Sequence, residues 1–370
     1  MGEMSDDTIL RRAAPGQLSR RHFARLLAGS GLALATISFG GSLRAAEQPP
    51  VLYTWEGFDT SDFFPDYMKK HTTAPLLQTF VDENEAFENL SSGLVVDVAH
   101  PCADTFGHWR TAGLLQPIDT GRLSHWSELF APLKAIPGAN ENGKQWFIPV
   151  DWGTTSVAYR SDLVQVTDDS YAMLWNKQYA GKLSIGEDAT ETVMMAALVA
   201  GIADPFNPTD ADLERVKQVL EEQKPLLKFY WSDDTIIKEA ITSGEVVATS
   251  MWSDTFRSLK QQGVPVNYMI PKEGILSWCC GFVLASAAPQ VDKAYDLIDA
   301  VLSPTAGEWL IRRGSNHSNR LTYSHLDPKV LAEMGVPQDP TDLLAHSRFL
   351  HEYPRLAAYQ RIFDEIRNGT

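Results

Sequence analysis

Short apolar runs with strand character alternate along the chain with stretches in which apolar residues recur at helical spacing. We expect strands over residues 51–54, 77–81, 94–99 and 246–252. We expect helices over residues 62–71, 84–90, 192–201, 210–223, 235–244, 292–302, 304–312 and 355–367. This alternation indicates an α/β fold whose mainly parallel sheet is covered on both faces. Ligands of such sheets lie beyond the carboxyl ends of the strands, where Trp55 and Cys102 fall.

Residues 148–159 form a strand-like run that is interrupted by a proline and a glycine. Pro149 forces the preceding residue towards extended geometry, and Gly153 permits a backbone angle that other residues resist. We expect this run to cross between two lobes beside a ligand cleft, with a new strand beginning at Val157. Residues 275–286 repeat the pattern. An ordinary buried strand with a kink is the alternative interpretation.

The length of 370 residues fits two domains better than one. The first 46 residues have the layout of an export signal. Arg20-Arg21 precede an aromatic residue, an uncharged apolar run follows over residues 26–43, and Arg44-Ala45-Ala46 supplies small residues for cleavage. The paired arginines favour the twin-arginine route, with removal of residues 1–46. A membrane anchor is the alternative, which the glycines and serines of the run weaken.

The chain is acidic, with 32 Lys and Arg against 47 Asp and Glu. The leader holds six of these basic residues and three of the acidic ones, so the formal charge of the remaining chain is near −18. Such a surface repels nucleic acid and anionic lipid head groups, and it raises the local concentration of cationic ligands.

Enzyme signatures are absent from the sequence: it has no His-Glu-x-x-His, Gly-x-Ser-x-Gly or Cys-x-x-Cys motif. Tryptophans instead recur beside acids near expected strand ends. Indole faces attract ammonium groups and carboxylates accept their hydrogen bonds, so this pattern suits an extended cationic amine. The alternative is that tryptophans fill cores and acids cap helices; the spacing of Asp188 and Glu191 is that of a capping box. The recurring groups are Trp55-Glu56, Asp151-Trp152, Trp252-Ser253-Asp254 and Trp278.

A series of short motifs, in order over nearly all of the chain after the leader, resembles the periplasmic spermidine/putrescine-binding proteins of ABC importers. The motifs are Tyr53-Thr54-Trp55-Glu56, Asp97-Val98-Ala99, Ile148-Pro149 with Trp152-Gly153, Glu187-Asp188-Ala189 with Glu191, Ser243-Gly244-Glu245, Met251-Trp252, Pro271-Lys272-Glu273-Gly274 and Trp278. The resemblance implies a two-lobed periplasmic binding protein fold of the class II type with three hinge crossings, which closes on its ligand. Lobe 1 would comprise residues 47–154 and 276–340, and lobe 2 residues 155–275 and 341–370.

The resemblance also implies a set of ligand-binding residues. Those carried over from the family are Trp55, Glu56, Asp188, Glu191, Ser232, Trp252 and Trp278, with Phe58 where the family often has Tyr. Three positions depart from the family: Cys280 replaces an Asp, Cys102 a polar Ser, and Asp104 a nearby aromatic residue. With one carboxylate lost, we expect a shorter, less charged or modified ligand, unless Asp104 or Asp254 substitutes for it.

The three cysteines leave three interpretations open. They are free, small apolar residues; or Cys102 and Cys280, which the resemblance places beside one cleft, form a disulfide that leaves Cys279 free; or a thiol metal site includes His100 or His317.

The resemblance thus implies a monomeric periplasmic protein without cofactor or catalysis that delivers a polyamine-like cation to a separate ABC permease and ATPase. One alternative is the same fold with another solute, such as an amino-acid derivative or a metal complex. The other is a secreted enzyme with Cys102 or Cys280 as nucleophile and His100 or His317 as base.

Overall fold

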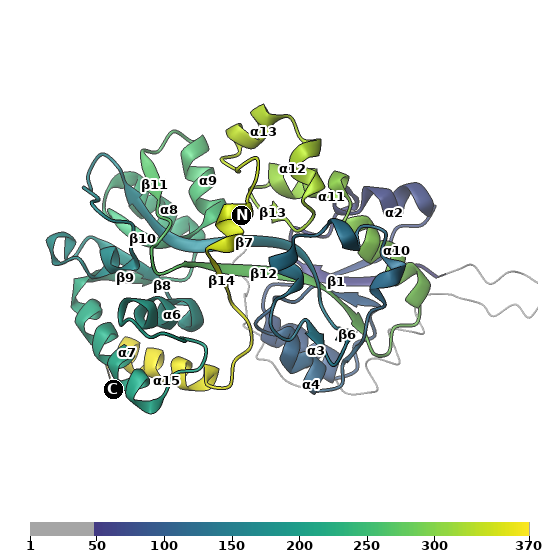
Figure 1. Cartoon of the computed structure of the whole chain (residues 1–370), viewed down its shortest axis with the longest axis horizontal. Helices are drawn as coiled ribbons and strands as arrows, with labels where there is room; N and C mark the ends of the chain where they lie inside the picture. Colours follow the sequence, from purple (N-terminus) through teal and green to yellow (C-terminus); the bar gives the residue numbers. More distant parts are fainter. Residues whose placement is uncertain (1–47, 370) are drawn as a thin grey trace, which may run out of the picture. The chain divides into compact units, whose positions relative to one another are not determined.

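The computed structural model describes residues 48–369, so the expected leader over residues 1–46 lies outside the described residues. The described part is an α/β structure (Figure 1). Its strands are β1 (Val51–Trp55), β2 (Leu76–Phe80), β3 (Val98–Ala99), β4 (Leu115–Gln116), β5 (Asn140–Glu141), β6 (Lys144–Gln145), β7 (Ile148–Arg160), β8 (Leu183–Gly186), β9 (Leu227–Trp231), β10 (Ala248–Trp252), β11 (Val266–Tyr268), β12 (Ile275–Ala285), β13 (Asn316–His317) and β14 (Ser347–Phe349).

Helices pack against the sheet in both of its halves. They are α2 (Pro65–Lys70), α3 (Glu83–Ser91), α4 (Phe106–Thr111), α5 (Ala131–Lys134), α6 (Ala189–Val199), α7 (Asp210–Gln223), α8 (Asp234–Ser243), α9 (Ser253–Gln261), α10 (Val291–Val301), α11 (Pro304–Arg312), α12 (Leu321–His325), α13 (Pro328–Glu333), α14 (Thr341–Ala345) and α15 (Leu356–Asn368). Among residues 48–369, none of these helices has the length and apolar character needed to cross a bilayer.

The main sheet has the strand order β2-β1-β3-β12-β7-β10-β8-β9. Strand β1 pairs in parallel with β2 and β3 at one side, and β8 pairs in parallel with β9 and β10 at the other. The two parallel parts are joined by the antiparallel pair of β7 and β12. The expected parallel character therefore holds within each part, and the sheet is antiparallel where the parts meet.

Strands β7 and β12 each belong to both parts of the sheet. The first half of β7 pairs with β12, and its second half pairs with β10 and β11. Strand β12 begins beside β14 and ends beside β3 and β4. Figure 1 shows the two strands running together between two groups of helices. A third connection passes through β14 to α15, which packs against α6 and α7. The two-lobed fold with three crossings is thus confirmed.

We call the part with β1–β4, α2–α5 and α10–α13 the first lobe, and the part with β8–β11, α6–α9 and α15 the second lobe. Two hydrophobic clusters draw on residues 52–152 and 279–344, and two others draw on residues 157–276 and 350–366. Each lobe therefore has a core of its own. The lobe limits at residues 154, 275 and 340 stay a prediction.

The expectation of two strands within residues 148–159 was wrong, because β7 is one continuous strand of 13 residues. Gly153 also has a different role from the one expected. Its φ is not among the positive values of the chain. A Cβ atom at Gly153 would lie 2.2 Å from Cζ2 of Trp278 on the paired strand, so the glycine makes room for an indole.

Most element limits differ from the expected ones by one or two residues, and a proline explains one of the larger differences. The expected helix over residues 62–71 begins instead as a short 3₁₀ turn, Ser61–Phe63, and continues as α2 from Pro65. Phe64, between them, has φ −136° and ψ 55° because a residue before proline avoids the helical region. The third strand is shortened to Val98–Ala99, whereas α7 and α11 have the expected limits.

Replacing Gly153 by Ala tests the close approach of the two crossing strands. We expect a loss of about 1–3 kcal/mol in the free energy of unfolding, because the new methyl group overpacks the Trp278 ring. Urea denaturation measures this loss. The same substitution in a Trp278→Ala background is expected to cost less.

Gly121→Ala is the matched control, since Gly121 is exposed and its nearest neighbour is the flexible carboxylate of Asp119. If Gly153→Ala lowered the free energy of unfolding equally in the wild type and in the Trp278→Ala background, Gly153 would not serve to make room for the indole.

Candidate functional site

A cavity of about 270 Å³ lies where the first and second lobes face each other across the crossing strands. Both lobes contribute to its lining. The lining residues are Trp55, Glu83, Cys102, Asp104, Asp188, Glu191, Trp252, Asp254, Trp278 and Leu350. Eight of the twelve expected site residues are thus brought together around one cavity: Trp55, Cys102, Asp104, Asp188, Glu191, Trp252, Asp254 and Trp278.

Three indoles supply the aromatic surface of the cavity. Trp55 ends β1 and packs against Phe80, with the ring centroids 4.6 Å apart. Trp252 ends β10 and packs edge-on against Trp231, with the centroids 5.4 Å apart. Trp278 comes from the crossing strand β12. All three are half-buried, so part of each ring stays accessible from the cavity.

The second-lobe acids Asp188 and Glu191 serve both the helix and the cavity. Asp188 is the N-cap of α6, and its Oδ1 accepts a hydrogen bond of 2.7 Å from the backbone N–H of Glu191. The Glu191 carboxylate does not return to the cap. It accepts hydrogen bonds from the Thr155 hydroxyl at 2.6 Å and from Trp252 Nε1 at 3.3 Å. Asp188 therefore both caps α6 and lines the cavity, whereas Glu191 lines the cavity without completing a capping box.

The two first-lobe acids, Glu83 and Asp104, follow the carboxyl ends of β2 and β3. Glu83 is the first residue of α3, and its Oε1 accepts hydrogen bonds from the Cys102 backbone N–H at 2.6 Å and the Thr105 hydroxyl at 2.8 Å. Asp104 follows β3 in the same loop as Cys102. These contacts bring Glu83, which is distant in sequence, beside the loop that carries Asp104.

All five acids of the lining have raised pKa values. Burial, with repulsion from Asp104, raises the pKa of Glu83 to about 8. Burial, with repulsion from Asp188, raises the pKa of Glu191 to about 8 and that of Asp104 to about 6. Removal from water also raises the pKa of Asp188 and of Asp254. The lining contains no Lys, Arg or His, so a bound cation would relieve this repulsion.

Four expected site residues lie outside the cavity lining. Glu56 is exposed in the turn after β1, and Ser232 is exposed after β9. The Phe58 ring packs against other aromatic rings of the first-lobe core. Cys280 is buried. Their part in binding stays a prediction.

Two lining residues were missed from the sequence. Glu83 could have been found, because it follows the carboxyl end of β2 just after the helix cap Asp82, where ligands of parallel sheets lie. Leu350 carried no such signal. It reaches the cavity because β14 pairs with β12, and its backbone N–H donates to the Ser277 carbonyl at 2.8 Å.

Cys102 and Cys280 form a disulfide that links the loop after β3 to the crossing strand β12. Of the three interpretations of the cysteines, the disulfide is therefore the one observed. Cys279 is free and buried, and burial raises the pKa of its thiol well above the ordinary value. Neither Cys102 nor Cys280 is a thiol that could act as a nucleophile in this form.

The two histidines considered as bases or ligands are internal hydrogen-bonding groups. His100 lies 2.9 Å from the Thr54 hydroxyl and 3.0 Å from Asp151 Oδ1. His317 contacts Thr322, and burial lowers its pKa to about 3. Within residues 48–369, no group of three or more His, Cys, Asp and Glu is placed to hold a metal ion.

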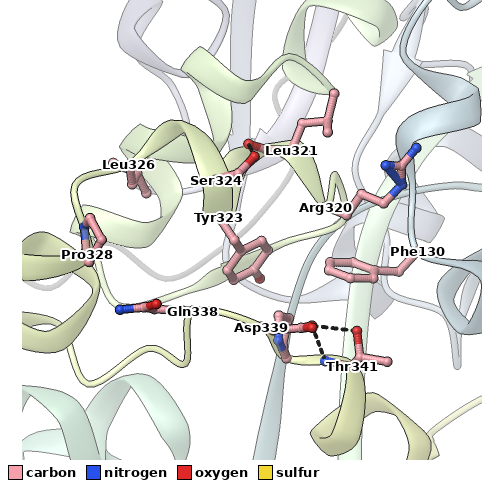
Figure 2. A pocket seen from close by; sticks show the side chains of 11 residues that line it. Phe130, Arg320, Leu321, Tyr323, Ser324, Leu326, Pro328, Gln338, Asp339 and Thr341 are labelled. Atoms are coloured by element: carbon pink, nitrogen blue, oxygen red, sulfur yellow. Dashed lines mark hydrogen bonds between the residues drawn. The ribbon is translucent and has the colours of Figure 1, made fainter.

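A larger cavity of about 490 Å³ lies elsewhere and lacks all the expected site residues (Figure 2). Asp339 is the acid in its lining, and its Oδ1 accepts hydrogen bonds from the backbone N–H of Thr341 at 2.9 Å and from the Thr341 hydroxyl. Arg320 and Phe130 also line it. This cavity therefore has a single carboxylate, against the five of the cavity between the lobes.

Comparison with known proteins gives one family match and several relatives. The family model described as bacterial extracellular solute-binding protein matches residues 83–310. The putrescine/agmatine-binding protein of Pseudomonas aeruginosa is 27% identical over 292 residues, which cover 74% of this chain and 77% of that protein. The putrescine-binding periplasmic protein PotF of Escherichia coli is 25% identical over 307 residues, which cover 78% and 81%.

A solved structure has the same fold as this chain. The spermidine/putrescine ABC transporter substrate-binding protein PotD of Streptococcus pneumoniae superposes with a TM-score of 0.75 at 17% identity. The match covers 87% of this chain and 99% of that one.

The pH dependence of stability tests the acidic lining. Glu83 and Glu191 have folded-state pKa values near 8 against an ordinary value of 4.5. The ligand-free protein is therefore expected to lose stability as the pH rises from 5 to about 8.5, because folding then holds buried carboxylates ionised. Urea denaturation across this range measures the slope.

Glu191→Gln keeps an acceptor for Thr155 and is expected to reduce this slope. Glu85→Gln, on the exposed side of α3, is the matched control. A slope unchanged in Glu191→Gln would contradict ionisation of the buried lining as its cause.

Removing the disulfide is expected to destabilise the protein. For the double variant Cys102→Ser/Cys280→Ser we expect a loss of about 2–5 kcal/mol in the free energy of unfolding, because the bridge closes a long loop. Reductant should lower the urea midpoint of the wild type and leave that of the double variant unchanged. Cys279→Ala, which keeps the bridge, should remain sensitive to reductant; a wild type that reductant does not affect would argue against the bridge.

Proposed function

Because this chain belongs to the family of bacterial extracellular solute-binding proteins, we propose that it is the solute-binding component of an ABC importer. We propose further that it captures a polyamine or a related cationic amine in the cavity between its lobes. The resemblance seen in the sequence is confirmed, since the family match spans residues 83–310 and the relatives carry polyamine-binding names.

The composition of the cavity lining is the observation that carries this proposal. Three indoles and five carboxyl groups surround a space whose lining has no basic side chain. An ammonium group placed there would be attracted by the aromatic faces and would donate charge-assisted hydrogen bonds to the carboxylates. The acids repel one another in the ligand-free protein. A bound cation would reduce this repulsion, and it would therefore be stabilised more strongly here than at an isolated carboxylate.

The same lining argues against the alternative of an amino-acid derivative. The carboxylate of such a solute needs a basic partner or a set of N–H donors. The cavity instead presents carboxylates from both lobes. Native mass spectrometry of the purified protein separates the two cases by the mass of any retained ligand.

The ligand set follows from the cavity. The proposed ligand-binding residues are the eight expected ones that line it, joined by Glu83 and Leu350. The relatives are transport proteins, and we propose that this chain likewise performs no chemistry and needs no cofactor. Cys102, which lines the cavity, and Cys280 are joined in a disulfide, so neither is the free thiol nucleophile that the enzyme hypothesis requires.

The remaining parts of the proposal concern the cellular setting. Export through the twin-arginine leader would place a monomer in the periplasm, where one named relative also works. A separate permease and ATPase would receive the closed, loaded form. The lobes would close about β7, β12 and the connection through β14.

Calorimetric titration with putrescine, agmatine and spermidine tests the proposed ligand. We expect saturable binding of at least one of them, with Glu191→Gln weakening it about 10- to 100-fold through loss of a charged hydrogen-bond acceptor. Affinity is expected to rise from pH 6 to pH 8.5, because the cation binds the ionised form of carboxyls whose pKa values are raised. Proton release on binding, seen as a dependence of the heat on the buffer, should accompany this.

Tryptophan fluorescence gives an independent reading of the same titration, since three indoles line the cavity. Glu85→Gln is the control for a change of net charge alone. Absence of saturable binding by all three amines would refute the amine assignment while leaving the fold and family intact.

A further inference from the structure

A second cavity, of about 540 Å³, lies on the other face of the crossing strand β7. Successive residues of a strand point to opposite faces, and Thr154 lines this cavity whereas Thr155 donates to Glu191 of the cavity between the lobes. The two cavities have no lining residue in common. We call this space the rear cavity; α9 and β11 of the second lobe form one wall, and residues 335–343 form the other.

A buried arginine without an acid partner lines the rear cavity. Arg257 is 5% exposed, and it forms no ion pair with a carboxylate of residues 48–369. Its guanidinium donates to the Gly314 carbonyl and to Asn316 Oδ1 at 3.3 Å, and its other N–H groups have no acceptor in this part of the chain. Asp254, one turn earlier on α9, acts on its charge from beyond ion-pair distance. A buried charge normally has a partner of opposite sign, so Arg257 lacks an anion.

Ser253 supplies a second donor at the same place. Its side chain is buried and lines the rear cavity. The Ser253 oxygen accepts a hydrogen bond of 3.3 Å from the backbone N–H of Thr154, but its own hydroxyl proton has no acceptor among residues 48–369. Because Ser253 and Arg257 lie one turn apart on α9, the cavity has two buried donors on one element and no bonded acceptor for them. This is the donor set that a carboxylate requires.

The remaining walls of the rear cavity are mostly apolar. Ile270 stands out because it is 54% exposed, which is unusual for a large aliphatic side chain beside a cavity. The volume is within the range of small-molecule sites, and such sites combine apolar walls with a few polar groups. The apolar lining residues are Phe256, Ile270, Ile275, Val336, Pro337 and Leu343.

Two acids limit the kind of anion that fits. Asp339 and Asp342 line the rear cavity and are exposed, so they lie where it meets solvent. A second carboxylate at the far end of a ligand would be repelled by them, whereas an apolar chain would not. A ligand with one carboxylate is therefore favoured over one with two.

We propose that the rear cavity is a second ligand site, which binds a small apolar monocarboxylate. The carboxylate accepts hydrogen bonds from Arg257 and Ser253, and the apolar body of the ligand packs between Phe256, Ile270 and the wall of residues 335–343. This site is separate from the proposed amine site and takes a ligand of opposite charge.

Equilibrium dialysis with octanoate, 1-octanol and octanedioate tests this proposal on the purified protein. We expect saturable binding of one octanoate per chain. The alcohol, which lacks the charge, and the dicarboxylate, which the two acids repel, should each bind at least about 10-fold more weakly.

Two variants locate the bound octanoate. Arg257→Gln should reduce the preference for octanoate over octanol to within about 3-fold, because the charged donor is lost. Arg312→Gln, which removes an exposed arginine of α11, is its matched control and should keep the preference. Ile270→Asp should weaken octanoate binding at least about 10-fold by placing a charge on the apolar wall.

The second variant keeps the test decisive if Arg257→Gln does not fold. Ile270 is exposed, so Ile270→Asp is expected to fold, and thermal melts check this. Leu163→Asp is its matched control, since Leu163 is 49% exposed, belongs to the second lobe and is absent from the lining of the rear cavity.

The inference is overturned if the wild type shows no saturable octanoate binding or does not prefer octanoate to octanol. It is also overturned if Ile270→Asp binds octanoate as tightly as Leu163→Asp does, or if a folded Arg257→Gln keeps the full preference. None of these measurements involves an amine, so the proposed function is decided separately by its own titration.

Discussion

The antiparallel pairing of β7 with β12 is the constraint on which the rest of the structure depends. The two strands are paired from Ile148 to Thr155 on one strand and from Leu276 to Phe282 on the other, and each continues into a different lobe at its far end. The cores of both lobes are anchored on them. The cavity lies beside this pair because the carboxyl ends of β1 and β10 are directed towards it from the two sides. One residue type is required for the pairing itself, since only glycine at position 153 leaves room for Trp278.

Because the two lobes bring acids together at the cavity, the residues proposed to bind a cation also lower the stability of the ligand-free protein. Folding gathers five carboxyl groups in a space without basic side chains, and their pKa values rise as a result. The ligand-free fold therefore carries repulsion that the unfolded chain does not have. The proposed cationic ligand would remove that repulsion, and part of its affinity would then come from relief of the repulsion already present in the ligand-free protein.

Much of the fold was evident in the sequence because local patterns and tertiary structure agree. The helix α7 has the predicted limits, since its apolar residues lie on one face and Thr209 caps it. Prediction failed where a single residue acts through distant partners. Gly153 was interpreted as a source of backbone freedom, but its role depends on an indole 125 positions later in the chain. Phe58 packs against the first-lobe core outside the cavity lining, and its part in binding stays a prediction.

In the candidate site, too, residues placed by a neighbouring strand could be predicted, whereas residues placed by distant parts of the chain could not. Residues at the carboxyl ends of strands, such as Trp55 and Trp252, could be assigned because the topology of parallel sheets places them. Glu83 followed the same rule and was missed, because it stands directly before the helix expected over residues 84–90. Leu350 could not be predicted, since the sequence around it contains no pattern that indicates the pairing of β14 with β12.

The disulfide and the acid at position 83 are best understood together. The bridge from Cys102 to Cys280 places no charge in the cavity, but it restrains the loop whose backbone N–H holds Glu83. Without that restraint, only the hydrogen bonds from Cys102 and Thr105 would hold Glu83 beside the loop of Asp104, and any loss of that order would lower the affinity of the proposed ligand. A covalent link to the crossing strand therefore does for the first lobe what the α6 cap does for the second. Asp188 accepts from the backbone of Glu191 and keeps that pair together despite its like charges. Glu83 in the first lobe and the pair Asp188 and Glu191 in the second are thus held by bonds within the protein, so that closure of the lobes would bring two preorganised halves of the proposed cation site against each other.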